Sequence, residues 1–316
     1  MTTHDRSTSA GTAPHEMGLH PTSRAGVFGL LGLGAAILRY RFFVIAGAFP
    51  YLLGAAVAYN ATAEMNWLLL ALGLGGVVFV SLGIEGLNEY FDSRIGGDRV
   101  FAANRRAPLW WHLPLGLAGF GLSFILALYL VTLQGWPVLI FGLCGGAMAL
   151  SYLVPPVCLS YRGLGETVIA LGYGPGLVLG SFYLQTGRLS WQAALVSLVP
   201  GLMIFAVSLA NEVPDYYGDR LVGKKNLVVR AGRRTCALLY GLVLALLFLL
   251  IAVGLILGVF PAILGLCLLL VPVAWRSVRY GVAHCLEPVV YIRVVRTTIL
   301  VFVAVNTIAI LSYVLQ

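Results

Sequence analysis

The chain alternates long apolar stretches with short polar segments. Nine of the stretches are long enough to cross a bilayer core of about 30 Å as a helix, which takes roughly 17 to 25 residues. Their approximate bounds are 42–60, 67–88, 111–133, 137–154, 164–186, 191–211, 235–256, 258–275 and 294–315. The pattern predicts an all-α, polytopic membrane protein with about nine transmembrane helices.

Composition agrees with a chain that lies in lipid. Of its 316 residues, 60% are hydrophobic and 10% are charged, and the mean hydropathy is +0.94. These values exclude an ordinary soluble domain. Residues 1–25 are rich in Ser, Thr, Pro and His and lack an apolar core, so they predict a disordered tail without a signal peptide. Residues 26–316 are expected to form a single transmembrane domain.

The basic residues predict the orientation of the chain. If successive spans alternate in direction, 19 of the 20 Lys and Arg lie on one side of the membrane, and Arg188 is the exception. The positive-inside rule makes that side cytoplasmic, which places the protein in the inner (cytoplasmic) membrane. Orientation by the membrane also accounts for the net charge of +8. No nucleic-acid partner is therefore expected.

The acidic residues are few and concentrated. The chain has 12 Asp and Glu, and four of the Asp fall in two similar segments, NEYFDSRIGGDR at 88–99 and NEVPDYYGDR at 211–220. Each segment begins where an apolar span ends on the predicted cytoplasmic side. A single Asp at a helix end is commonly a solvated charge. Two such segments indicate a shared site, because isolated acids near the membrane core are costly, at about 2.5 to 3.5 kcal/mol each.

Helical spacing groups the side chains of each segment. Asn88 and Asp92 are four residues apart and share one helix face, as do Asn211, Asp215 and Asp219. Carboxylate and amide oxygens suit Mg²⁺, which commonly bridges one or two protein carboxylates to substrate phosphates. The segments therefore predict a magnesium site at the cytoplasmic ends of the membrane spans.

The same polar segments supply cations for a phosphate group. They hold Arg94, Arg99, Arg105, Arg106, Arg162, Arg220, Lys224, Lys225 and Arg230. The chain lacks a glycine-rich loop ending in Gly-Lys-Ser/Thr, so nucleotide binding is not supported. A ligand that needs both a diphosphate site and a membrane is an isoprenyl diphosphate, and this is the predicted donor.

The motifs resemble those of a known family. Over essentially the whole chain after the tail, the sequence is similar to the UbiA superfamily of intramembrane prenyltransferases, which carry two Asp-rich motifs on a nine-helix bundle. Asn88, Asp92, Gly96 and Asp98 look most like the branch that prenylates 1,4-dihydroxy-2-naphthoate in menaquinone biosynthesis. Segment 161–187 is similar to the same branch, as are Asp215, Gly218, Asp219, Arg220, Gly223 and Lys224. The resemblance implies prenyl transfer to a hydrophobic aromatic quinone precursor.

Some positions depart from the family. The chain has Arg39-Tyr40-Arg41-Phe42 where the family often shows Arg-Pro-x-Thr, and Asn226 follows Lys225 where Thr is common. Other acceptors therefore stay open: 4-hydroxybenzoate, homogentisate, a porphyrin or chlorophyll alcohol, and a glycerol phosphate. A transporter and a non-catalytic lipid-binding protein remain alternatives from other classes.

The resemblance and the motifs together suggest a role for each candidate residue. Asp92, Asp98, Asp215 and Asp219 are expected to hold one or two Mg²⁺, with Asn88 and Asn211 orienting them or binding diphosphate oxygen. The diphosphate is expected to contact Arg39 or Arg41, Arg162, Lys224 and Tyr152. Glu85 could be a metal ligand, a proton partner of the acceptor or a partner of a buried Arg. Glu166 leaves the same alternatives open, and a local role at a helix start is favoured.

Overall fold

The computed structural model describes residues 45–95 and 110–316, all of them in one compact unit, Tyr40–Gln316. The side chains of 92–95 are not part of this description. Helices are the regular structure of these ranges, which contain no strand. The predicted all-α class is confirmed. The predicted tail, 1–25, lies outside the described residues.

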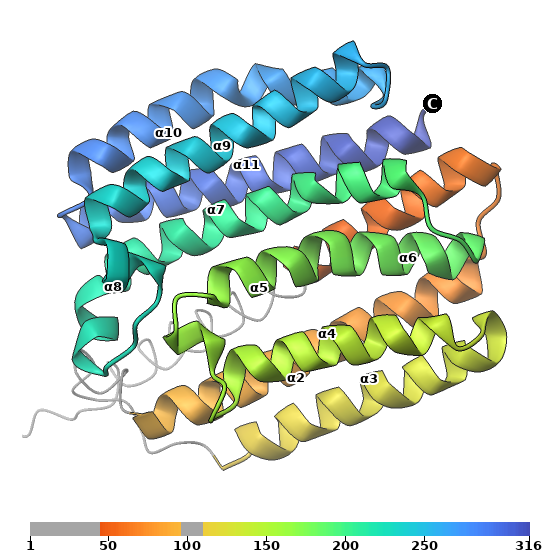
Figure 1. Cartoon of the computed structure of the whole chain (residues 1–316), viewed down its shortest axis with the longest axis horizontal. Coiled ribbons are helices and arrows are strands. Elements are labelled where there is room, and N and C mark those ends of the chain that lie inside the picture. The colour runs from red at the N-terminus through yellow and green to blue at the C-terminus, as the bar shows by residue number, and fades with distance from the viewer. Residues whose placement is uncertain (1–44, 96–109) are drawn as a thin grey trace, which may run out of the picture. The chain divides into compact units, whose positions relative to one another are not determined.

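Long helices run side by side through the described unit (Figure 1). The first occupies residues 45–62. It is followed by α2 (Trp67–Ile95), α3 (His112–Gln134), α4 (Pro137–Leu153), η2 (Leu159–Tyr161), α5 (Gly165–Leu171), η3 (Gly172–Gly176), α6 (Leu177–Thr186), α7 (Trp191–Leu221), α8 (Leu227–Ala231), α9 (Arg233–Ile256), η4 (Ala262–Leu270), α10 (Val271–His284) and α11 (Pro288–Val314).

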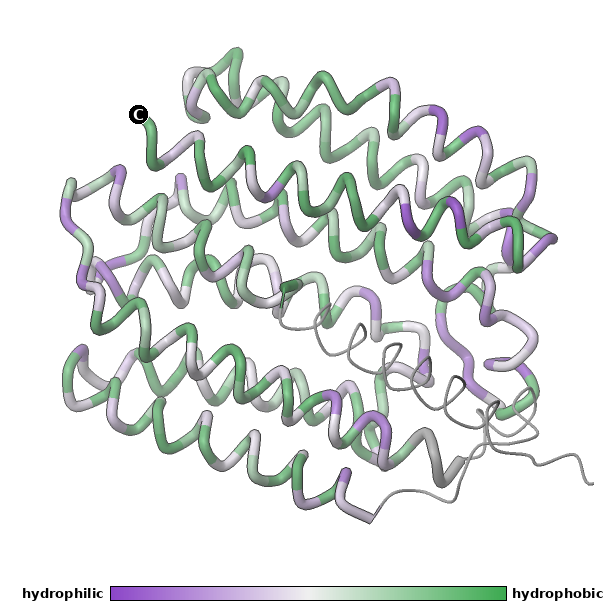
Figure 2. The backbone as a smooth tube through the Cα atoms, turned by 180° about the vertical axis from the view of Figure 1, so that it is seen from behind, coloured by the Kyte–Doolittle hydropathy of each residue, from purple (hydrophilic) through white to green (hydrophobic). Residues whose placement is uncertain are grey.

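Seven helical stretches in the described ranges are long and apolar enough to cross a membrane. The segments α5, η3 and α6 form one of them, and η4 with α10 forms another. The helix α4 is apolar but shorter, with 17 residues. Hydrophobic residues dominate the tube along these helices (Figure 2). The chain is a multi-pass membrane protein, and the predicted count of nine spans is not confirmed.

Two predicted spans end too early in the sequence. The span predicted to end at 211 continues as α7 to Leu221, with Pro214 inside the helix. The span predicted over 258–275 extends through α10 to His284. Hydropathy marks where contact with lipid ends, whereas backbone hydrogen bonding can carry a helix further into polar surroundings. The second Asp-rich motif therefore lies on a helix and not in a loop.

The helix α7 lies at the centre of the bundle. Of its most apolar window, 67% is buried, against 17% for α3 at the periphery. It packs closely against η3, a single π-helical turn that contains Pro175. A Cβ at Gly174 would come within 2.7 Å of the Ser197 carbonyl oxygen and of the Gly201 Cα. Glycine at 174 is therefore required by the distance between the two backbones.

The helix at 45–62 joins distant parts of the chain. The Tyr51 hydroxyl donates to the Leu69 carbonyl oxygen of α2 at 3.2 Å. The ring of Phe49 meets the ring of Phe302 on α11 edge to face, with centroids 6.0 Å apart. This first described helix thus contacts both α2 and the last helix. In both views of the backbone, the C-terminal ends of α2 and α7 lie at the same end of the bundle (Figures 1 and 2).

Candidate functional site

The C-terminal end of α7 carries the second Asp-rich motif. Asn211, Asp215 and Asp219 follow one another at intervals of four residues on this helix, as the sequence predicts. Asp215 is exposed, whereas Asn211 and Asp219 are partly buried. Because four residues make about one turn, the three side chains form a row on one face of α7. The row ends where the chain leaves the helix.

Polar contacts fix the carboxylate of Asp219. The Lys224 Nζ lies 3.4 Å from Asp219 Oδ1, and Asn226 Nδ2 donates to Asp219 Oδ2 at 2.6 Å. The backbone N–H of Lys224 also donates to the Asp219 carbonyl oxygen, at 2.9 Å. A hydrogen bond to an ionised group is among the stronger ones in proteins. The carboxylate is thus held in one orientation, with a cation beside it.

Asn226 links this carboxylate to the next helix. Its side chain is 1% exposed, and its Oδ1 caps α8 by accepting the N–H of Val229 at 2.9 Å. An amide has donors and an acceptor, so one side chain serves both partners. The position of Asp219 therefore depends on the start of α8. Sequence reasoning noted Asn226 only as a departure from the family and did not predict this role.

Glu166 on α5 also forms a hydrogen bond to the region where α7 ends and α8 begins. We call this region the α7–α8 corner. Glu166 lies in the first turn of α5, as expected, and is 2% exposed. Its Oε1 accepts the backbone N–H of Leu227 in α8 at 2.8 Å. The expected local role is thus incomplete, because the hydrogen bond crosses to a segment 61 residues away. Such a long-range partner leaves no signal in local sequence.

A second, partly buried acid lies close to Glu166. The carboxyl of Glu212 on α7 lies within hydrogen-bonding reach of Glu166, and the Oε2 atom of neither has another hydrogen-bond partner among the described residues. Sequence reasoning did not single out Glu212, although it directly follows Asn211 in the motif.

The first motif is only partly described. Asn88 is partly buried on α2, and the backbone of Asp92 belongs to the last turns of this helix. The side chain of Asp92 and all of Asp98 lie outside the described residues, as do Arg39 and Arg41. The roles expected for these residues stay predictions.

Glu85 lies one turn deeper on α2. It is 1% exposed and close enough to Tyr173 of η3 for an electrostatic interaction. The structure thus adds a contact between the first motif's helix and the π-helical turn that packs on α7. The alternatives for Glu85 that the sequence left open are not decided by this contact.

The residues expected to bind diphosphate lie on neighbouring segments. Tyr152 of α4 packs against the start of α5, where a Cβ at Gly165 would meet its Cε2 at 2.9 Å. The Lys224 Nζ lies 5.9 Å from the centroid of the Tyr161 ring. Arg162 is exposed, and its Nη2 donates to the Pro156 carbonyl oxygen at 2.6 Å. Lys224 is therefore beside Asp219, while Arg162 rests against its own loop.

The donor set fits a hard cation that shares its ligands with a substrate. Among residues 45–95 and 110–316, no three His, Cys, Asp or Glu side chains form a group that could hold a metal ion. The α7 row offers oxygen donors from Asp215 and Asp219. Mg²⁺ is commonly held by one or two carboxylates together with phosphate oxygens and water. The residues of α7 suit such a site and do not form an all-protein cage.

Comparison with known proteins extends these observations. The 1,4-dihydroxy-2-naphthoate octaprenyltransferase of Bacillus subtilis is 27% identical over 192 residues, which are 58% of this chain and 61% of that protein. The chain thus matches less than two thirds of that relative's length.

Solved structures share the fold. The apo structure of a UbiA homologue from Aeropyrum pernix K1 aligns with a TM-score of 0.63 and 16% identity, over 86% of this chain and 98% of that one. A UbiA homologue from Archaeoglobus fulgidus bound to GPP and Mg²⁺ aligns with a TM-score of 0.53 and 15% identity, over 86% and 99%. The profile of the UbiA prenyltransferase family matches residues 47–284. Because this match covers well over half of the chain, the protein belongs to the UbiA prenyltransferase family.

Proposed function

We propose that this protein transfers a prenyl group from an isoprenyl diphosphate to an aromatic quinone precursor of the 1,4-dihydroxy-2-naphthoate type. The observation that carries the proposal is the Asp219–Lys224 pair, with a distance of 3.4 Å, at the end of the Asp row on α7. A carboxylate and an ammonium group side by side suit a ligand that includes both a metal ion and an anion. Membership of the family and the activity of the Bacillus relative support this assignment.

The acids of both motifs have the metal role in this proposal. Asp215 and Asp219 on α7, with Asp92 and Asp98 of the first motif, hold Mg²⁺ together with diphosphate oxygens. Bound Mg²⁺ supplies positive charge that neutralises the leaving diphosphate. Asn88 and Asn211 lie one turn before the first acid of each motif and orient these carboxylates or bind phosphate oxygen. The common end of α2 and α7 in the bundle supports a joint site (Figures 1 and 2).

The basic side chains have the anion role. Lys224 is held beside the motif by Asp219, so its ammonium group is in position before the substrate binds. Charge that develops on the diphosphate as the allylic carbon–oxygen bond breaks is then met by a preorganised cation. Arg39 or Arg41, Arg162 and the Tyr152 hydroxyl complete the contacts to the diphosphate. For Arg162 this requires that the guanidinium leave the Pro156 carbonyl.

The apolar helices have the role of excluding water from the reaction. The allylic carbocation must meet the aromatic carbon before it meets water, and a site inside a lipid-embedded bundle excludes water. The long prenyl tail and the acceptor both partition into the bilayer. The basic residues orient the site toward the cytoplasm, where soluble prenyl diphosphate precursors can enter.

The proposal is tested by product formation with purified protein. Labelled isoprenyl diphosphates of several lengths are incubated with 1,4-dihydroxy-2-naphthoate and, in parallel, with 4-hydroxybenzoate and homogentisate. We expect a prenylated naphthalene product and release of diphosphate, both abolished by removal of Mg²⁺. Prenylation of another acceptor alone would correct the acceptor. Absence of diphosphate release with every donor and acceptor, from protein that remains folded, would contradict the activity.

A further inference from the structure

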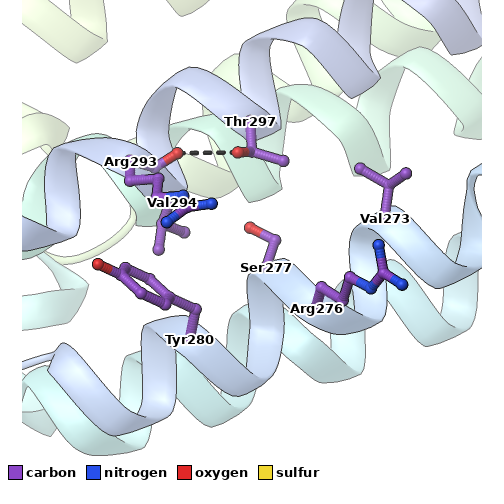
Figure 3. Close-up of a pocket in the computed structure, with 7 residues that line it drawn as sticks. All are labelled: Val273, Arg276, Ser277, Tyr280, Arg293, Val294 and Thr297. Atoms are coloured by element: carbon purple, nitrogen blue, oxygen red, sulfur yellow. Dashed lines mark hydrogen bonds between the residues drawn. The ribbon is translucent and has the colours of Figure 1, made fainter.

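A pocket of about 240 Å³ lies between α10 and α11, away from the Asp row (Figure 3). The α10 side is formed by Val273, Arg276, Ser277 and Tyr280. The α11 side is formed by Arg293, Val294 and Thr297. In Figure 3, Ser277 of α10 lies between the two helices, the Arg293 guanidinium lies beside Val294, and the Arg276 guanidinium is directed toward Val273. No residue of this lining is acidic, and the function proposed above uses none of it.

The back of the pocket is a closed hydroxyl network. The Tyr240 hydroxyl of α9 lies 3.1 Å from Ser277 Oγ and 2.8 Å from Thr298 Oγ1. Thr298 in turn donates to the Val294 carbonyl oxygen at 2.8 Å. At the rim, Thr297 Oγ1 donates to the Arg293 carbonyl oxygen at 2.9 Å. These hydroxyls are satisfied within the protein, so the polar groups left for a ligand are the two guanidinium groups and the Tyr280 hydroxyl.

Those guanidinium groups are not matched by acids. Arg276 and Arg293 are both exposed, and within the described residues neither forms an ion pair. The Arg293 guanidinium lies 5.2 Å from the centroid of the Tyr280 ring. The acid of the nearby turn, Glu287, contacts His284 Nδ1 at 3.0 Å instead. Two unneutralised arginines at one pocket favour an anion, and their planar donors match phosphate oxygens.

The pocket opens toward lipid near one end of the helices. Both helices belong to candidate membrane spans. Val273, in the pocket lining, is 41% exposed. Arg276 lies about two turns, or roughly 12 Å, before the end of α10.

The same end of the bundle carries the second Asp-rich motif. Arg233, at the start of α9, donates to the Leu286 carbonyl oxygen of the α10–α11 turn at 3.2 Å and to the Tyr217 hydroxyl of α7 at 2.9 Å. The pocket therefore lies at the strongly basic end, which the positive-inside rule assigns to the cytoplasmic leaflet. That leaflet is rich in anionic lipid, and basic pockets between transmembrane helices recognise such headgroups.

We propose that this pocket binds the phosphate group of an anionic phospholipid from the surrounding bilayer. Arg276 and Arg293 contact the phosphate from the two helices, and an acyl chain lies along the lipid-facing side of Val273. A pocket of about 240 Å³ is smaller than the roughly 300 to 1,000 Å³ of sites that enclose a whole drug-sized ligand. It suits a headgroup whose tails stay outside in the bilayer.

The alternative is that the arginines only snorkel to the headgroup region. Arg279 on α10 and Arg296 on α11 provide the matched comparison, because they are exposed and do not line the pocket. The double variants R276Q/R293Q and R279Q/R296Q remove the same charge from the same two helices. Only the first alters the pocket.

The experiment measures retained lipid by native mass spectrometry. Wild-type protein and both double variants are purified, equilibrated with phosphatidylglycerol or phosphatidylcholine, and checked for folding by size exclusion. We expect wild type and R279Q/R296Q to retain one phosphatidylglycerol in preference to phosphatidylcholine. In R276Q/R293Q the affinity for phosphatidylglycerol should fall roughly thirtyfold, the amount expected from two arginines near an anionic surface.

A third variant, Thr297→Phe, keeps both arginines and fills the pocket with a ring, and it should lose the lipid too. Equal loss in both double variants, unchanged retention in R276Q/R293Q, or retained lipid in Thr297→Phe would overturn the proposal. Displacement of the lipid by millimolar inorganic phosphate would assign the pocket to a soluble phosphate. These lipid measurements do not depend on prenyl transfer, so they stand apart from the function proposed above.

Discussion

The corner between α7 and α8 and the pocket between α10 and α11 are both basic, lie at the same end of the bundle and differ in what balances their charge. At the α7–α8 corner, Lys224 contacts Asp219, and the buried Glu166 and the partly buried Glu212 lie close by. In the lining of the other pocket, Arg276 and Arg293 have no acid between them. Mixed charge suits an anion that arrives with a metal ion, whereas unbalanced positive charge suits an anion alone.

The α7–α8 corner is also the more constrained of the two regions. Asp219 is hydrogen-bonded by Asn226, which caps α8, and α8 is fastened to α5 by Glu166. The arginines of the pocket lie on exposed helix faces and can move without breaking a network. Substitutions at the corner should therefore change chemistry and stability, while substitutions at the pocket should change lipid binding.

The largest effect is expected from the acids of the α7 row. Asp215→Asn and Asp219→Asn each keep the shape of the side chain but remove a charge that the metal needs. We expect turnover to fall by about 10² to 10³, as for the loss of one stabilising group in a transition state. Release of labelled diphosphate by purified protein measures it. Glu287→Gln, an exposed acid of the α10–α11 turn, is the control and should keep wild-type turnover.

A smaller effect is expected on stability from Glu166. Glu166→Ala leaves the Leu227 N–H without its acceptor in a buried place, which should lower the free energy of unfolding by about 1 to 3 kcal/mol. Denaturation in mixed micelles measures the change. Glu166→Gln retains the accepting oxygen and should recover most of the loss. If both variants are equally unstable, the hydrogen bond to Leu227 is not what stabilises the corner.

Substitutions of Asn226 distinguish its role in orienting Asp219 from its role in capping α8. Asn226→Ser keeps a good N-cap but shortens the side chain, so the amide donor to Asp219 is lost. We expect the Mg²⁺ concentration for half-maximal activity to rise about fivefold, the equivalent of roughly 1 kcal/mol for one hydrogen bond. Stability should stay near wild type, whereas Asn226→Ala should lower it as well. An unchanged Mg²⁺ dependence in both variants would mean that Asn226 does not position the carboxylate.

The smallest effect on turnover is expected from the pocket. R276Q/R293Q should change the turnover number in phosphatidylcholine micelles by less than about twofold, because the pocket contains no residue of the Asp row and its variants disturb only exposed side chains. Assays of diphosphate release across the lipid series measure this. A loss approaching that of Asp219→Asn would show that the two basic regions are one site and would break the comparison.

Much of the fold could be predicted from the pattern of apolar residues. The stretches predicted over 111–133 and 137–154 coincide with α3 and α4 within one residue, because turn residues and polar ends mark their limits. The end of α7 could not be found in this way, since its last ten residues include four charged residues as well as Pro214 and Gly218. Their helical state depends on the contacts that α5, α8 and α9 make with them.

In the candidate site, too, one part could be predicted from the sequence and another part could not. The spacing of Asn211, Asp215 and Asp219 was enough to predict a row on one helix face. The pairing of Glu166 with Leu227 and the approach of Glu212 to Glu166 depend on how α5, α7 and α8 pack. Positions that lie far apart in sequence carry no mark of their contact, so those partners could not be predicted from spacing alone.

The contact between Phe49 and Phe302 has a consequence for how the protein is made. Ribosomes deliver the chain from its N-terminus, so the helix at 45–62 is synthesised long before α11. Its aromatic partner, Phe302, belongs to α11 and is synthesised much later. Until α11 has been synthesised, the first described helix lacks this contact. Assembly of the bundle is therefore completed only after translation has passed residue 302.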